Sequence, residues 1–207
     1  MFTKIKSISI LIILIVISNF SVSENNKISD SQKKEGEALK ICFLEWDFMI
    51  VAINMKDLGF TLDEVTEIIG KNLKEGPDNS TSAKIKLASS YSIPYIFNQS
   101  NDKNLINGIN KSIRKGFDNC LSRNEIIKTK FLNEGMIVLE IFSIASDFMK
   151  NNKSKQEFLN YNSTNKEIKE SIAQLVYDED TDLKKLLKMM QEFQINIINK
   201  YLIEKSK

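Results

Sequence analysis

Histidine is absent from the 207 residues of the chain. Without it, the chain has no Ser-His-Asp or Cys-His nucleophile pair, no zinc site of the HExxH type and no imidazole for acid–base catalysis. An enzyme built on this sequence has to use carboxylates, Lys, Tyr or a cofactor. We therefore expect a protein that is not an enzyme and that uses no cofactor or metal ion.

Proline and glycine are scarce, with two and seven residues. β-Sandwiches and barrels need many such residues in turns, whereas apolar residues in this chain recur at helical steps of three and four. The formal net charge is only +2, and basic and acidic residues are interspersed, so the basic stripe of nucleic-acid-binding proteins is missing. The sequence predicts an all-α fold, built as helical hairpins or a bundle, with no nucleic-acid partner.

The first residues have the pattern of a secretory signal peptide. Two lysines precede an almost unbroken apolar run over residues 8–17, and the small residues Ser21 and Ser23 follow it. The run is about half the ~20 residues that a membrane span requires. We predict a signal peptide over residues 1–23, with an uncleaved anchor as the alternative, then a flexible leader over residues 24–32. The protein is expected in the periplasm or outside the cell, in contact with the membrane only through the signal segment.

Apolar stripes predict helices along the rest of the chain. The first runs over about residues 31–58 and stops at Gly59, and the segment Thr61-Leu62-Asp63-Glu64 then has the form of a capping box. The remaining predicted features are a second helix to about residue 72, a loop over 76–80, a third helix over about 82–97 that Pro94 kinks or shortens, and a fourth helix that breaks at 122–124.

The second half of the chain aligns weakly with the first. The matched segments are Ala52 with Ala145, Thr61–Glu64 with Ser154–Glu157, Pro94-Tyr95 with Val176-Tyr177, and the stripe Ile106, Ile109, Ile113, Cys120 with Leu183, Leu186, Met190, Ile197. A duplication predicts two similar four-helix units, over residues 33–122 and 123–207. The alternative is a single helical domain of about eight segments.

The two cysteines, Cys42 and Cys120, each lie on the apolar stripe of a predicted helix. An even number of cysteines in an exported chain indicates a disulfide, so we predict a bridge between them. Two buried thiols are the alternative. The second half has Gly135 and Ile197 at the matching places and is expected to lack a bridge.

Several carboxylates are candidates for chemistry. Glu45 and Asp47 flank a tryptophan, and Glu64 and Glu67 lie on the predicted second helix. Paired carboxylates cleave glycosides when both face one cleft, which leaves a carboxylate-based enzyme of the cell envelope as an alternative function. The other interpretation takes Glu64 as a cap and the remaining three as solvated helix faces. The acidic segment 178–182 is interpreted as a cap for the last helix.

Aromatic residues and the last helix leave two further alternatives. Trp46, Tyr91, Tyr95 and Phe97 are interpreted as core residues, and the other reading is a pocket for an apolar ligand that the protein carries. The last helix, over residues 183–203, is apolar along one side, so it either docks within the chain or forms the seam of a homodimer.

One resemblance extends over about residues 38–120. It rests on Cys42, Ala52, Gly59, the segment Thr61–Glu64, Tyr95 and Cys120, in that order after a signal peptide. The pattern resembles small all-helical, disulfide-bearing proteins of the proteobacterial periplasm, such as immunity proteins that neutralise type VI secretion amidase effectors. The resemblance implies a non-enzymatic helical scaffold that binds a protein and covers its cleft. No effector-binding loop matches, so the resemblance supplies no binding residues, and the loops over residues 76–80 and 97–101 are the exposed candidates.

Overall fold

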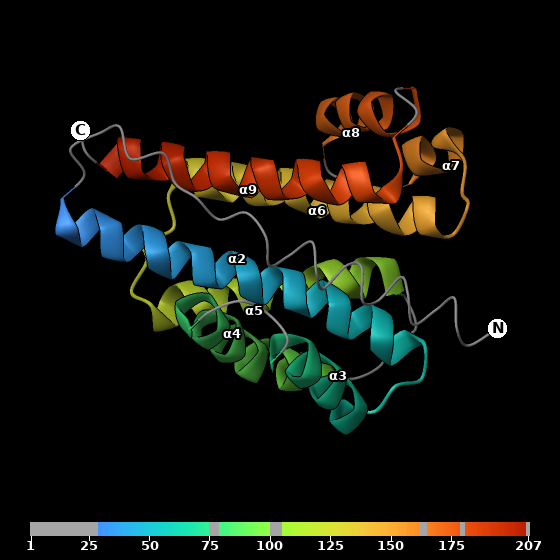
Figure 1. The fold of residues 1–207 in the computed structure, drawn as a ribbon. Helices are drawn as coiled ribbons and strands as arrows, with labels where there is room; N and C mark the ends of the chain where they lie inside the picture. Colours follow the sequence, from blue (N-terminus) through green and yellow to red (C-terminus); the bar gives the residue numbers. More distant parts are fainter. Residues whose placement is uncertain (1–28, 75–78, 100–104, 162–164, 179–180, 206–207) are drawn as a thin grey trace. The chain divides into compact units, whose positions relative to one another are not determined.

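The structure is a computed structural model that describes residues 29–74, 79–99, 105–161, 165–178 and 181–205. All regular elements in these ranges are helices, which confirms the all-α prediction (Figure 1). They are α2 (Asp30–Asp57), α3 (Leu62–Lys74), α4 (Asn79–Phe97), α5 (Leu105–Arg123), α6 (Lys130–Lys150), α7 (Lys155–Asn160), α8 (Lys166–Ala173), the π-helical turn η1 (Gln174–Asp178) and α9 (Leu183–Lys205).

Helix α2 begins at Asp30 because Ser29 and Gln32 form a capping box. The Ser29 hydroxyl accepts a hydrogen bond from the Gln32 N–H at 3.2 Å, and Gln32 Oε1 accepts one from the Ser29 N–H at 2.9 Å. The predicted leader over residues 24–32 is therefore wrong at its end, since residues 30–32 are helical. Residues 24–28 and the predicted signal peptide over 1–23 lie outside the described residues.

The chain divides into two compact units. Unit 1 extends to Lys128 and includes the residues from Leu202 onward, and unit 2 is Thr129–Tyr201. In unit 1, α2 packs against α4 and α5, and α3 packs against α4 (Figure 1). In unit 2, α8 packs against α6 and α7, and α9 lies along α6. The apolar side of α9 is thus used inside unit 2, as in the docking alternative for this helix.

The core of unit 1 is centred on aromatic residues of α2 and α5. The Phe117 ring lies 5.1 Å from Phe43 and 5.8 Å from Trp46, measured between centroids, and all three side chains are buried. Buried residues follow one another without interruption from Cys42 to Met49. Polar residues in this segment of α2 are therefore buried as well. The sequence does not predict their burial, because this segment is not a continuous apolar run.

Helix α4 begins earlier than predicted and ends at the predicted residue. It begins at Asn79, so the last two residues of the predicted loop over 76–80 are helical, while 76–78 lie outside the described residues. Pro94 lies inside the helix, which continues to Phe97. The end of the helix is held by Lys56 of α2, whose ammonium group donates to the carbonyls of residues 96, 97 and 99 at 3.2, 3.3 and 2.8 Å. The last carbonyls of a helix have no donor within the helix, and the Lys56 ammonium group supplies one at this end.

Helices α2 and α6, which the internal alignment equates, end in the same backbone geometry. The turn after each helix contains a residue in the left-handed region, Gly59 with φ 86° and Asn152 with φ 53°. The N–H of the following residue donates to the carbonyl five residues earlier, at 3.0 Å in the first case and 2.9 Å in the second. This is the hydrogen bond of a Schellman motif.

The two helix ends are followed by matching capping boxes. Glu64 Oε2 accepts a hydrogen bond from the Thr61 N–H at 2.8 Å, and Glu157 Oε2 accepts one from the Ser154 N–H at 2.8 Å. In return, each hydroxyl accepts from the backbone N–H of its glutamate, at 3.3 Å in both boxes. Together with the helix ends, these capping boxes give the two aligned segments the same local geometry.

Contacts between helices also recur at aligned positions. Met49 packs where a side chain of Gly116 would otherwise lie, which joins α2 to α5. The aligned residues of unit 2 are Phe142 and Phe193, whose rings lie 6.2 Å apart and join α6 to α9. The residue types differ, but the same pair of helix positions makes the contact in each unit.

Candidate functional site

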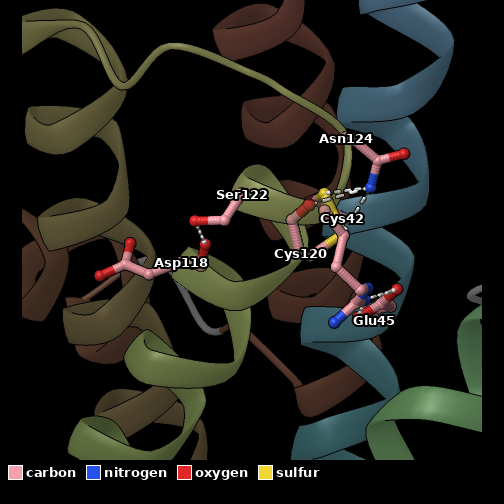
Figure 2. The surroundings of a disulfide bond; sticks show 7 residues. Cys42, Glu45, Asp118, Cys120, Ser122 and Asn124 are labelled. Atoms are coloured by element: carbon pink, nitrogen blue, oxygen red, sulfur yellow. Dashed lines mark hydrogen bonds and ion pairs between the residues drawn. A yellow bond between two sulfur atoms is a disulfide. The ribbon is translucent and has the colours of Figure 1, made fainter.

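Cys42 of α2 and Cys120 of α5 form the predicted disulfide (Figure 2). The sulfur atoms lie 2.10 Å apart, the Cα atoms lie 5.5 Å apart, and both residues are fully buried. Asn124 lies beside the bond, with its Nδ2 at 3.4 Å from the Cys120 sulfur and 2.9 Å from the Cys120 carbonyl oxygen. The bond is a buried cross-link between two core helices, so the alternative of two thiols is not what the structure contains.

Unit 2 joins the equivalent helices without a disulfide. At the aligned positions, Ile197 of α9 packs directly on Gly135 of α6. A Cβ atom at Gly135 would lie 2.8 Å from Ile197 Cδ1 and 2.9 Å from Cγ1, so the isoleucine fills the place of a side chain. A covalent bond in one unit thus corresponds to packing in the other.

Glu45 lies one helical turn after Cys42 and is buried, with 3% of its surface exposed (Figure 2). The interpretation of Glu45 as a solvated residue is therefore wrong. Its two carboxylate oxygens each accept a hydrogen bond from Arg123 Nη2, at 2.6 Å. Burial raises the pKa of Glu45, and the hydrogen bond and positive charge of Arg123 lower the pKa by less. The buried carboxylate therefore depends on a single cation for compensation.

Arg123 is also stacked on an exposed tyrosine. Its guanidinium carbon lies 4.3 Å from the centroid of the Tyr91 ring, and 48% of Tyr91 is exposed. The Arg123 side chain itself is 37% exposed. A planar guanidinium can stack on a ring and bind a carboxylate at the same time, which the ammonium of a lysine cannot do in the same geometry. We call Glu45, Tyr91 and Arg123 the Arg123 cluster.

The Arg123 cluster has no counterpart in unit 2. The alignment places Val138 at the position of Glu45 and Lys200 at the position of Arg123. Lys200 lies 5.6 Å from the centroid of the Phe131 ring, so a cation over a ring recurs, but the buried carboxylate does not. The helices aligned with α2 and α5 therefore have no buried ion pair at these two positions.

The other predicted carboxylates are not brought together with Glu45 into a catalytic pair. Asp47 is buried, with 9% exposed, but residues two apart on a helix point to different faces. Glu64 serves as the cap of α3, and hydrogen bonds from Thr61 lower its pKa. Glu67 is exposed on the same helix. The solvated-face interpretation is thus wrong for Asp47 and correct for Glu67.

The four predicted aromatic candidates lie in different surroundings. Trp46 is fully buried against the core, and its Nε1 has no hydrogen-bond partner among the described residues. The Tyr95 hydroxyl donates to the Ser112 carbonyl at 3.2 Å, and burial raises the pKa of Tyr95. Phe97 is half-buried beneath the Lys56 ammonium. Tyr91 is thus the one of these four that is exposed, at 48%, so its interpretation as a core residue is wrong.

No group of three or more Cys, Asp or Glu side chains in the described ranges is arranged to hold a metal ion. Among the helices of the described residues, none combines the length and apolar character needed to cross a membrane. The acidic segment before α9 contributes a cap, since Asp182 accepts a hydrogen bond from the Lys185 N–H at 2.6 Å. This agrees with the interpretation of that segment as a helix cap.

Arg123 is the residue that the sequence analysis missed. Arg114 and Arg123 are the two arginines among 29 basic residues, so an arginine is itself an unusual choice in this chain. That rarity was a usable signal, because arginine is favoured over lysine where stacking and paired hydrogen bonds are needed. Its partners, Glu45 and Tyr91, are far away in sequence and carry no such signal.

Comparison with known proteins gives no match: no protein-family model, no curated protein and no solved structure is similar to this chain. The resemblance to periplasmic immunity proteins therefore stays a prediction. The function has to be argued from the residues themselves.

Proposed function

We propose that the chain is exported and that unit 1 binds another protein through a surface centred on Tyr91 and Arg123. One observation carries this proposal: a half-exposed tyrosine ring is stacked on a guanidinium that a buried carboxylate fixes in place. Tyrosine and arginine are enriched among the few residues that dominate binding energy in protein interfaces.

The disulfide supports the rigidity of this surface. Cys42 precedes Glu45 by three residues, and Cys120 precedes Arg123 by three residues, so the cross-link joins α2 and α5 one turn away from the ion pair. Side chains that are already ordered lose less conformational entropy when a partner binds. A pre-ordered Tyr91 and Arg123 suit recognition by a rigid scaffold, which is the mode of action expected of an inhibitor or immunity protein.

The proposed compartment rests on the same bond. Disulfides persist in oxidising spaces such as the periplasm and the exterior of the cell. A buried disulfide is compatible with the signal peptide predicted over residues 1–23, and the partner is then a protein of the envelope or the surroundings. No specific observation favours the rival functions: Glu45 is engaged by Arg123, and the buried rings of unit 1 pack on one another.

The proposal is tested by affinity capture from an envelope extract of the source cells with the oxidised protein as bait. Three baits are compared: the natural protein, Tyr91→Ala, and Leu58→Ala as a matched control that also removes an exposed apolar side chain from unit 1. We expect the natural bait and Leu58→Ala to retain one partner in similar amounts, and Tyr91→Ala to retain at least about tenfold less. Equal retention by all three baits, or no discrete partner, would contradict the proposal.

A further inference from the structure

We infer that Arg123 is a receptor for a carboxylate, which an aspartate or glutamate side chain of the protein partner supplies. This inference rests on the proposed function and deepens it, because it names the group that the partner places on the Tyr91–Arg123 surface. The site is formed by unit 1 alone.

The donors of Arg123 are only partly used. A guanidinium carries five N–H groups on Nε, Nη1 and Nη2. Within the described residues, the guanidinium donates two hydrogen bonds, both from Nη2 to the carboxylate of Glu45. The N–H groups on Nε and Nη1 remain for a ligand, on a side chain that is 37% exposed. The donors are held in place from two directions, by Glu45 and by the ring of Tyr91.

The charge of the site fits a single carboxylate. Glu45 already offsets part of the Arg123 charge, so the site offers one partly compensated cation. Lys128, the next basic residue along the chain, is paired with Asp118 at 2.8 Å. Phosphate and nucleic-acid sites collect several cations, whereas one planar guanidinium suits a monovalent carboxylate. The partly buried setting, with the Tyr91 ring on one side, also strengthens a hydrogen bond between charged groups.

The internal repeat argues that the ion pair serves a ligand. A buried ion pair is weak evidence for stability, because desolvation of the two charges offsets their attraction. Unit 2 has Val138 and Lys200 at the two positions, and its helix α6 ends in the same backbone geometry as α2 of unit 1. What unit 1 has in addition is an arginine that Glu45 and Tyr91 hold in place and whose Nε and Nη1 donors are not used by any described residue.

The experiment follows the side-chain NMR resonances of the two arginines in the oxidised, isotope-labelled protein. Sodium acetate replaces sodium chloride at constant ionic strength, and an Arg114→Lys variant assigns the signals. Arg114 is the internal control, because its Nε is 4.0 Å from Asp118 on the same helix. We expect the Arg123 signals to shift along a saturating curve, with a change at least about three times that of Arg114. Signals of Arg123 that change no more than those of Arg114 would overturn the inference.

A second variant separates this inference from the proposed function. Tyr91→Leu removes the stacked ring and keeps an apolar side chain, so we expect acetate to bind Arg123 several-fold more weakly in this variant. Unchanged acetate binding in Tyr91→Leu would contradict the arrangement argued above. A saturating acetate response without any captured protein would disprove the proposed function and leave the carboxylate site standing. A captured protein without an acetate response would disprove the carboxylate site and leave the proposed function standing.

Discussion

Glu45 is a carboxylate on a helix segment that is buried from Cys42 to Met49, and Arg123 is the cation that compensates it. Removal of one member of such a pair leaves a buried charge without compensation, whereas replacement of both members leaves no such charge. The residues that unit 2 uses, Val138 and Lys200, suggest which replacement the fold accepts.

We predict that Arg123→Ala lowers the free energy of unfolding by about 2 to 3 kcal/mol, below the range for fully buried pairs because Arg123 is partly exposed. The double variant Glu45→Val, Arg123→Lys, which copies unit 2, should lose less than Arg123→Ala alone. Denaturant unfolding of the three proteins provides the measurement. A double variant that is less stable than the single variant would mean that the two units are not equivalent at these positions.

We expect the titration of Glu45 to contribute to the pH dependence of the free energy of unfolding. Its pKa is raised above 4.5 in the folded protein, so the folded state holds the proton to a higher pH than the unfolded state does. The contribution of Glu45 is therefore present at low pH and is lost as the pH rises above 4.5 through the folded pKa. Glu64 and Glu157 have lowered pKa values, and their contributions change in the opposite direction.

The comparison that isolates Glu45 is the natural protein against Glu45→Gln, since Glu64 and Glu157 are common to both. We predict that the stability of Glu45→Gln relative to the natural protein increases as the pH rises from 4.5. Thermal unfolding over a series of pH values measures this difference. A difference that is independent of pH, or that changes with the opposite sign, would refute the assignment of a raised pKa to this group.

Gly135 is required by the close approach of Ile197. Alanine in a helix gains about 1 kcal/mol over glycine, but overpacking of a core costs about 1 to 3 kcal/mol. Because the added Cβ would meet Ile197 at 2.8 Å, we predict that Gly135→Ala is destabilising by about 1 kcal/mol. Gly70→Ala is the matched control: it lies in α3 with no atom within 4 Å of the added Cβ, and it should gain stability. Equal effects of the two substitutions in denaturant unfolding would contradict the predicted contact.

At the scale of elements, the disulfide and the glycine–isoleucine contact are two ways to join the same helix positions. Cys42 and Cys120 are 78 residues apart, so their bond restricts the unfolded chain strongly. We predict that Cys42→Ser with Cys120→Ser lowers the free energy of unfolding by roughly 4 kcal/mol. Denaturant unfolding of the oxidised natural protein and the double variant measures this loss.

The pair found in unit 2 is the control for that experiment. In Cys42→Gly with Cys120→Ile, the buried isoleucine contributes about 2 kcal/mol, and the helical glycine costs about 1 kcal/mol. We expect this variant to exceed the double serine variant in stability by about 1 kcal/mol. If it does not, the equivalence of the two helix pairs fails at this contact.

Local sequence signals predicted the helix ends well. The stop at Gly59 and the boxes at Thr61 and Ser154 depend on neighbouring residues alone, and the structure has all three. Pro94 lies inside α4, which ends at Phe97 as predicted and is not shortened at the proline. Its end is stabilised by Lys56, 40 residues or more before the carbonyls that it binds, and no local pattern reports such a contact.

At the scale of the whole molecule, the sequence predicted the fold class and the disulfide pair but only part of the proposed surface. Apolar periodicity is strong in long helices, and a chain with two cysteines allows one bridge. The Arg123 cluster is different, because Glu45 and Arg123 are 78 residues apart and their pairing depends on how α2 and α5 pack. A glutamate and an arginine at that distance cannot be matched without the fold.

We propose that the chain is exported and that it folds with Cys42 joined to Cys120. The most direct test is the intact mass of the protein recovered from its source cells, after treatment with an alkylating reagent and without reduction. We expect a chain that begins at Glu24, after the signal peptide predicted over residues 1–23, and that carries no alkyl group on either cysteine. A chain that still begins at Met1 and carries two alkyl groups would contradict it.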